Sequence, residues 1–357
     1  MWTDKGEIKG PFNYYHDIFT KYGCSDENIV KLQSMWNEPR RVYHNQGHLE
    51  EILSLIENWK ITHPKDEGEF EALILAAFFH DGVYDPKSQT NEEDSAVLYS
   101  TMCTFKYKHF ELVNALVHGM ILDTKDHTQK PSSDLSAKFL EFDLHGLLYG
   151  SLSRMISDEN KIMREFGFVD FTLYKDTRGT KFLDKFAPHI KSINPQSNID
   201  SYIDWYKNRS PKIAIFAGSF YPFHKGHLDI LKRAEHIFDK VIVLLCVNPK
   251  KHNNIEQVKG YVNELRKKLP NNQVEFHDGM LHHYIKKLTY PVSIVKGLRS
   301  ASDFDSEKLQ LRYMEDMYPE INIVYIVSDR KFEHVSSSGI KEIQGMGAME
   351  EAQNYLI

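Results

Sequence analysis

Residues 217–231 read AGSFYPFHKGHLDIL and place two histidines just after an apolar run that ends in glycine. That run, KIAIFAG at residues 212–218, predicts a strand, and residues 225–238 predict the helix that follows it. His224 and His227 are three apart, so both imidazoles would lie on one face of the helix start. A helix start also presents free N–H groups and a partial positive charge. The stretch therefore predicts a site for a polyphosphate.

Two other interpretations of the histidine pair stay open. A zinc site on a helix more often uses i, i+4 spacing with further ligands, and neither His236 nor His252 has a suitable spacing. Histidines that pack by chance at a strand–helix junction are also common. The pair by itself does not decide among these interpretations.

The apolar pattern changes near residue 205, which predicts two domains. Before that point apolar residues recur at helical spacing, as in HLEEILSLIENW at 48–59. After it, short β-branched runs alternate with helix-like segments, which is typical of a parallel sheet with crossover helices. We expect an all-helical domain over residues 1–205 and an α/β parallel-sheet domain over residues 206–357.

Composition narrows the function classes. The 357 residues carry a formal net charge of −6, which disfavours nucleic acid as a partner. The apolar runs are much shorter than the ~20 residues that cross a bilayer, and the first residues lack a signal-peptide core. We therefore expect a cytoplasmic protein with small-molecule partners and no membrane. Cys24, Cys103 and Cys246 are far apart in the sequence, so we expect neither a disulfide framework nor a CxxC pair.

Three further loops in the second half carry cations or hydroxyls where strands end. VNPKKHN at 247–253 contains two lysines, and IVKGLRSASDFDSE at 294–307 contains Lys296 and Arg299. VSSSGIKEI at 335–343 places three serines at a predicted helix start. Each loop alone could be an ordinary solvated loop. Four such loops at one end of one sheet favour a phosphate-binding site.

The phrases GSFYPFHKGH, NPKK, KGLR and SSSGIK, in that order, resemble the HxGH nucleotidyltransferases, and most closely the phosphopantetheine adenylyltransferase family. The resemblance covers about residues 212–345 and implies a Rossmann-like fold. In that family an acceptor phosphate attacks the α-phosphorus of ATP and pyrophosphate leaves, without a covalent enzyme intermediate. Mg²⁺ accompanies the ATP through its phosphates.

The resemblance also implies roles for individual residues. His227 would stabilise the transition state at the α-phosphate, and His224 would contact the neighbouring phosphates. Ser219 and Phe220 would touch ATP, and Ser219 also the acceptor phosphate. The remaining implied residues are Lys251 and Lys296 for the acceptor phosphate and, for the nucleotide, Gly297, Leu298, Arg299, Glu307, Ser336, Ser337 and Ser338.

One position departs from the family pattern. Tyr221 stands where the family usually has an aspartate, so a bulky phenol replaces a small acid beside the expected acceptor site. We take 4'-phosphopantetheine as the expected acceptor. Nicotinamide mononucleotide or a simpler phosphate ester stays open as an alternative.

The helical half contains a second group of chemically active residues. His80 and Asp81 end the apolar run ALILAAFF, and Asp143 lies in the similarly apolar KFLEFDLHGLL. Buried charges need a partner, and a metal supplies one. With His48 they make a mixed nitrogen and oxygen set that suits Mn, Fe, Co, Zn or Mg and leaves positions open for water. A hydrogen-bonded core pair remains the alternative for His80 and Asp81.

The order His48, His80-Asp81, Asp143 resembles the HD-domain metal-dependent phosphohydrolases over about residues 36–185. By that resemblance these four residues are the metal ligands. Asp85 and Glu93 would be acid/base or supporting groups, and His127 a phosphate contact.

Together the two resemblances imply a bifunctional enzyme, with an all-α HD-type domain before a Rossmann-like nucleotidyltransferase domain. The alternative is that the HD domain senses a nucleotide without hydrolysing it. The resemblance also allows a homo-oligomer.

Overall fold

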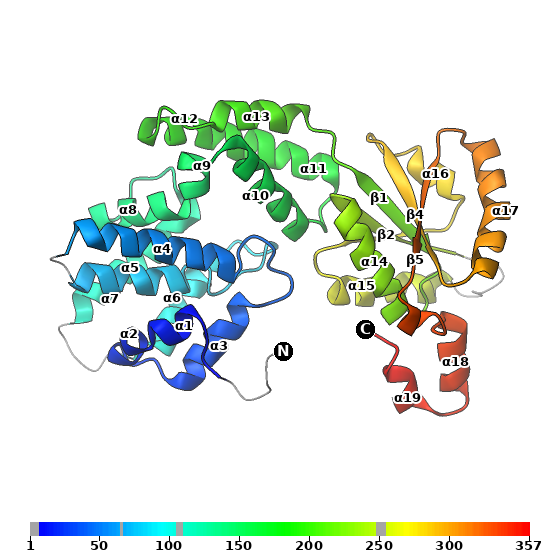
Figure 1. Cartoon of the computed structure of the whole chain (residues 1–357), viewed down its shortest axis with the longest axis horizontal. Coiled ribbons are helices and arrows are strands. Elements are labelled where there is room, and N and C mark those ends of the chain that lie inside the picture. Colours follow the sequence, from blue (N-terminus) through cyan, green and yellow to red (C-terminus); the bar gives the residue numbers. More distant parts are fainter. Residues whose placement is uncertain (1–6, 65–66, 105–109, 248–254) are drawn as a thin grey trace. The chain divides into compact units, whose positions relative to one another are not determined.

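A computed structural model describes residues 7–64, 67–104, 110–247 and 255–357 of the chain. The chain forms two compact units (Figure 1). The first comprises Met1–Glu165 and Arg178–Lys207, and the second comprises Phe166–Thr177 and Asn208–Ile357. The last residue of the first unit, Lys207, lies close to the expected boundary at residue 205. Nothing in the sequence indicated that Phe166–Thr177 belongs to the second unit.

The regular elements described in the first unit are helices. They are α1 Pro11–Tyr14, α2 His16–Lys21, α3 Asp26–Trp36, α4 Gln46–Thr62, α5 Glu67–Phe79, α6 Asn91–Met102, α7 Glu111–Asp123, η2 Thr124–Asp126, α8 Asp134–Asp143, α9 His145–Tyr149, α10 Leu152–Glu165, η3 Thr177–Leu183, α12 Asp184–Ile193 and α13 Ile199–Asn208.

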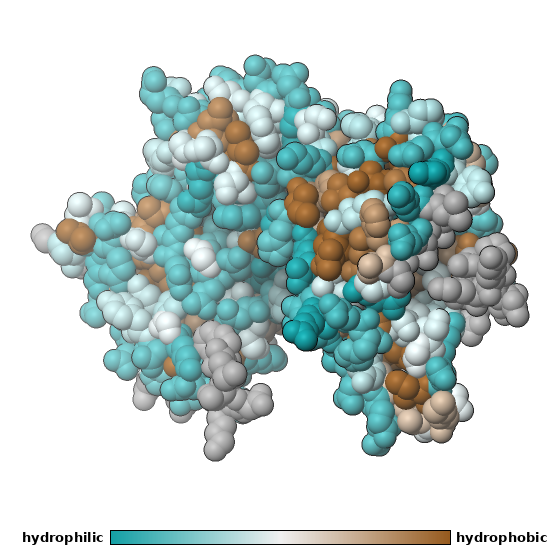
Figure 2. Space-filling view, turned by 45° about the vertical axis from the view of Figure 1, so that its right-hand side comes forward, coloured by the Kyte–Doolittle hydropathy of each residue, from teal (hydrophilic) through white to brown (hydrophobic). Residues whose placement is uncertain are grey.

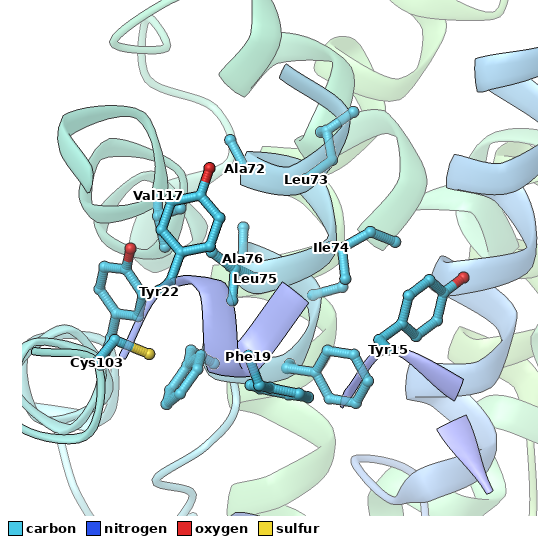
Figure 3. Packing of buried hydrophobic residues seen from close by; sticks show 14 of the residues in the cluster. Tyr15, Phe19, Tyr22, Ala72, Leu73, Ile74, Leu75, Ala76, Cys103 and Val117 are labelled. Atoms are coloured by element: carbon cyan, nitrogen blue, oxygen red, sulfur yellow. The ribbon is translucent and has the colours of Figure 1, made fainter. Parts of the chain in front are cut away.

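Helix α5 is the centre of this unit. Every residue from Phe70 to Phe79 is buried, so the helix is covered on all sides. Figure 3 shows Leu73, Ile74 and Leu75 on α5 amid aromatic side chains that include Phe19 from α2. Helices α4, α7 and α8 also pack against α5. The end of α5, where His80 and Asp81 follow, is therefore held by the core.

The second unit contains a five-stranded parallel sheet, which confirms the predicted α/β architecture. Its strands are β1 Ile213–Gly218, β2 Lys240–Cys246, β3 Gln273–His277, β4 Val292–Leu298 and β5 Asn322–Val327. The spatial order is β3-β2-β1-β4-β5, with every neighbouring pair parallel. Strands β1 and β4 are neighbours although two strands separate them in sequence. Their carboxyl ends mark the point where ligands bind in such sheets.

Helices accompany the sheet. They are α11 Phe171–Asp176, α14 Lys225–Ile237, α15 Ile255–Lys268, α16 Leu281–Ile285, α17 Ala301–Met317, η4 Arg330–Phe332, α18 Ser337–Gly345 and α19 Met349–Gln353. Side chains of α14 and α15 share an apolar cluster with Phe216 of β1 and Val243 of β2. This packing fixes the start of α14 against the carboxyl end of β1.

The early segment, Phe166–Thr177, is held to the sheet by a buried lysine. Lys240 at the start of β2 donates hydrogen bonds from Nζ to the backbone oxygens of Gly167 and Val169. Tyr290 donates from its hydroxyl to Asp170 Oδ2 at 3.0 Å. The segment thus belongs to the second unit by specific contacts.

The surface is mostly hydrophilic on the face that Figure 2 presents, with separate hydrophobic patches. Exposed large apolar side chains of the second unit include Phe304, Tyr313 and Val327. Among the described residues, no helix combines the length and the apolar character that a membrane crossing requires.

Candidate functional site

The two histidines of the HxGH stretch cap the start of α14 reciprocally. His224 is the N-cap residue, and its Nδ1 accepts from the backbone N–H of His227 at 3.3 Å. His227 Nδ1 accepts in turn from the backbone N–H of His224 at 3.3 Å. The rings stack with centroids 3.5 Å apart. The predicted pairing is therefore present, with His224 just before the first turn rather than within it.

These hydrogen bonds fix the proton positions on the imidazoles. A neutral imidazole that accepts at Nδ1 carries its proton on Nε2, so each ring keeps an Nε2–H donor for an anion. Burial, together with the nearby charge of Arg299, lowers the pKa of His224 to about 4. His224 is thus a neutral hydrogen-bond donor at physiological pH.

The loop before α14 has a constrained backbone. Phe220 adopts a φ of 43°, in a region that costs free energy for a residue with a side chain. A Cβ on Gly218 would meet the Phe220 ring at 2.7 Å, and a Cβ on Gly226 would meet the His224 ring at 3.2 Å. Glycine at these two positions lets both rings occupy their places.

A cavity of about 670 Å³ opens at the carboxyl ends of β1 and β4. Its size is in the range of small-molecule sites. The predicted residues that line it are Ser219, Phe220, His224, His227, Lys296, Gly297, Leu298, Arg299, Glu307, Ser336, Ser337 and Ser338. Lys251 lies outside the described residues. Predicted residues from three separate loops thus meet at one cavity.

The cations of this cavity are paired with acids. Lys296 Nζ lies 3.1 Å from Glu307 Oε2. Arg299 makes a two-pronged contact with Asp303, at 3.0 Å from both Nε and Nη2. Asp303 was not predicted, because a single acid in a loop has no distinguishing signal. A bound triphosphate would compete with these carboxylates for the cations, and a magnesium ion on its phosphates would offset the acids.

Tyr221 is the residue that departs from the family pattern. It is absent from the lining of the described cavity. Its ring packs edge-on against Tyr261 with centroids 5.1 Å apart, and Lys341 Nζ lies 4.4 Å from its centroid. The side chain that replaces the usual aspartate is thus engaged in aromatic and cation–π contacts.

The predicted ligands of the helical unit converge where three helix ends meet. His48 is in the first turn of α4, His80 and Asp81 follow α5, and Asp143 ends α8. His48 Nε2 lies 3.0 Å from Asp143 Oδ1, and His80 Nε2 lies 3.2 Å from Asp81 Oδ2 and 3.7 Å from Asp143 Oδ1. His127 Nε2 contacts the other oxygen of Asp143 at 2.7 Å.

This cluster has the chemistry of a cation site. His80 Nε2 is buried and makes no hydrogen bond. Ligand atoms of His48, His80 and Asp81 lie within 4.8 Å of one another. Burial lowers the pKa of His80, but the charges of Asp81 and Asp143 outweigh it and raise that pKa to about 9. The two carboxylates thus favour a positive charge at this site. The residues present fit a divalent metal.

The predicted acid/base residues contact other groups of the helical unit. Glu93 pairs with Lys125. The Asp85 side chain accepts from the backbone N–H of Lys87 at 3.0 Å and lies 3.9 Å from Arg40. The neighbouring Glu92 interacts electrostatically with one of the ligands, because burial and the charge of Asp81 raise the pKa of Glu92.

Two buried residues that sequence reasoning missed hold the ligand loops. Arg41 donates to the backbone oxygens of Asp81 and Gly82 at 2.6 and 2.9 Å. Glu165 accepts from three successive backbone N–H groups, residues 42–44, just before α4. Sequence alone does not separate Arg41 from its neighbour Arg40, and Glu165 is distant in the chain.

Comparison with known proteins identifies the second unit. Residues 215–343 match the cytidylyltransferase-like family model. Phosphopantetheine adenylyltransferase of Caldanaerobacter subterraneus is 36% identical over 138 residues, which are 38% of this chain and 86% of that protein. The enzyme of Dictyoglomus turgidum is 38% identical over 136 residues, covering 38% and 84%. That of Clostridium novyi is 38% identical over 143 residues, covering 39% and 88%.

The matched residues include the three loops whose predicted residues line the cavity. Through residues 215–343 the chain therefore belongs to the cytidylyltransferase-like family, and its C-terminal unit is a nucleotidyltransferase similar to phosphopantetheine adenylyltransferase.

Proposed function

We propose that the C-terminal unit transfers the adenylyl group of ATP to 4'-phosphopantetheine, which gives dephospho-coenzyme A and pyrophosphate. The names of the relatives support this acceptor. The observation that carries the proposal is the stacked His224–His227 pair at the start of α14, inside a cavity that Lys296 and Arg299 also line.

The chemistry needs positioned donors and no nucleophilic side chain. A phosphate oxygen of the acceptor attacks the α-phosphorus, and the bond from that phosphorus to the bridging oxygen of pyrophosphate breaks. Negative charge builds on the α-phosphate and the leaving group. Nε2–H of His227, the start of α14 and the cation of Arg299 stabilise that charge. Mg²⁺ enters with the ATP phosphates.

Incubation of the full chain with ATP, Mg²⁺ and 4'-phosphopantetheine tests the proposal. We expect pyrophosphate release in equal amount to an adenylylated product seen by mass spectrometry. Parallel reactions with nicotinamide mononucleotide test the alternative acceptor. Turnover of that nucleotide alone would overturn the assigned acceptor, and no pyrophosphate from either would overturn the adenylyl transfer.

We also propose that the N-terminal unit is an HD-type metal-dependent phosphohydrolase that cleaves a phosphate ester or pyrophosphate. The observation that favours it is the buried His80 Nε2, which has no hydrogen bond and faces the carboxylates of Asp81 and Asp143. His48, His80, Asp81 and Asp143 would hold the metal. A bound divalent ion lowers the pKa of a coordinated water, so that hydroxide is available near neutral pH.

Other residues of this unit have roles that need no metal contact. His127 can donate to a substrate phosphate once Asp143 turns its oxygen to another partner. Arg41 and Glu165 keep the ligand loops in place through backbone hydrogen bonds. Together they would hold the ligands in a fixed geometry, which metal sites require.

The test measures metal and phosphate together. The full chain is loaded with Mn²⁺ or Co²⁺, analysed for bound metal and assayed with a chromogenic aryl phosphate and with nucleoside phosphates. We expect one tightly bound ion for each chain and release of phosphate. Bound metal with binding of nucleotides and no hydrolysis would replace this proposal by the sensor alternative. Absence of bound metal would overturn both.

A further inference from the structure

The fold pairs two cysteines that are far apart in the sequence. Cys24 and Cys103 form an isolated antiparallel β-bridge between the end of α2 and the end of α6. Both are free thiols and both are buried. The sequence did not indicate this contact, because the distance between two residues in the sequence says nothing about a contact that helix packing creates.

Backbone contacts on both sides hold the two segments together. Gly23 has a φ of 77°, and a Cβ there would meet the backbone oxygen of Thr104 at 2.2 Å. Thr104 donates from its hydroxyl to the oxygen of Gly23 at 3.2 Å, and Asn28 donates from Nδ2 to the oxygen of Met102 at 3.1 Å. Only glycine at position 23 permits this approach. The bridge is therefore a built contact.

The geometry of the bridge suits a disulfide. Residues opposite each other in an antiparallel pair have Cα atoms about 4.5–5.5 Å apart. Disulfides need Cα separations of about 4.4–6.8 Å. Both cysteines belong to the same apolar cluster, and Figure 3 shows Cys103 among the residues of that cluster. A bond between the two sulfurs therefore needs little movement of the backbone.

We propose that Cys24 and Cys103 are a redox-active dithiol pair, which a small-molecule disulfide such as oxidised glutathione converts to an intrachain disulfide. One cysteine thiolate attacks a glutathione sulfur, forms a mixed disulfide and releases one glutathione thiolate. The second cysteine loses its proton, attacks the protein sulfur of the mixed disulfide and releases the other glutathione. Two electrons and two protons pass from the protein to two molecules of glutathione.

The surroundings determine how the reaction proceeds. A hydrogen bond with Cys24 and burial together raise the pKa of Cys103, so Cys103 stays protonated at neutral pH. Because both thiols are shielded from solvent, exchange requires a local opening of the segment, and low concentrations of urea will accelerate it. Cys246 lies in the other unit and lines the nucleotide cavity.

The experiment uses the full chain with Cys246→Ser, which leaves only the pair. The reduced protein is treated with oxidised glutathione, with and without urea below the unfolding transition, and its remaining thiols are alkylated. We expect a peptide pair that joins Cys24 to Cys103 and a Tm higher by roughly 5–10 °C than that of the reduced protein, because the bond restricts the unfolded chain. Dithiothreitol reverses both changes.

The matched control adds Cys24→Ala, which should leave no cross-link and no gain in Tm on oxidation. If that variant does not fold, the comparison of the oxidised and reduced parent with its reversal by dithiothreitol decides. Persistent mixed disulfides with glutathione, or two thiols that stay open to alkylation after treatment in urea, would overturn the proposal.

Discussion

The two sites of this chain solve opposite electrostatic problems. The nucleotidyltransferase cavity presents the imidazoles of His224 and His227, serine hydroxyls and the cations Lys296 and Arg299 around about 670 Å³ of open space. The helical site packs His48, His80, Asp81 and Asp143 into direct contact. The first arrangement suits a large anion, and the second suits a small cation. Histidine can serve both, as a donor through Nε2–H in the first and, as we propose, as a metal ligand in the second.

The largest expected effect on the anion-binding cavity is that of a substitution at His227. His227→Ala removes a donor aimed at the developing charge, and we expect adenylyl transfer to fall by about 10³-fold with little change in ATP binding. Steady-state rates and nucleotide titration measure the two quantities. His236→Ala, on the exposed last turn of the same helix, is the matched control and should keep full activity. An equal loss in both variants would contradict the assignment.

His224 sharpens the comparison through pH. Its pKa falls from the ordinary 6.5 to about 4 in the folded chain, so between these values the unfolded chain binds the extra proton. Protonation of His224 therefore leaves the free energy of unfolding unchanged above pH 6.5. It lowers that free energy as the pH falls towards 4, by up to about 3 kcal/mol. Urea unfolding of the parent and of His224→Asn measures it. The variant should show a flatter profile, and identical profiles would refute the shift.

A substitution of Asp143 tests the proposed metal site of the helical unit. Asp143→Ala removes an oxygen ligand between His48 and His127, and we expect affinity for Mn²⁺ to drop by about 100-fold, as measured by titration of the metal-free chain. Adenylyl transfer should be unchanged. Asp134→Ala, on the exposed first turn of the same helix, should bind metal like the parent. Equal affinity in all three proteins would rule out the proposed ligand set.

The smallest expected effect concerns Tyr221. Because this ring packs on Tyr261 and Lys341 and does not line the described cavity, Tyr221→Phe should alter the KM of the acceptor by less than about threefold. Acceptor titration at saturating ATP measures it. A change of tenfold or more would show that the phenol reaches the substrate after all.

The sequence was most informative where local patterns carry the chemistry. The run before Gly218 and the spacing of His224 and His227 were enough to predict a strand, a turn and a helix start, because these features depend on near neighbours. The parallel sheet followed from alternating patterns. The cavity could be predicted because strand ends of a parallel sheet lie at one edge.

Contacts between distant segments were beyond such reasoning. Asp303, Arg41 and Glu165 act through partners that only folding brings near, and their types are common at protein surfaces. Tyr221 was expected at the acceptor because its neighbours in sequence line the cavity, yet its ring turns towards Tyr261. The pairing of Cys24 with Cys103 likewise depends on how α2 and α6 end beside each other.

Lys240 has a practical consequence for anyone who wishes to study one activity alone. Its ammonium group is buried against the backbone oxygens of Gly167 and Val169, which precede the last helices of the first unit. A fragment that begins at residue 208 would lose these two acceptors together with the segment that covers the lysine. Division of the gene at a single site near residue 208 would therefore change the packing at the start of β2, whereas point substitutions leave these contacts in place.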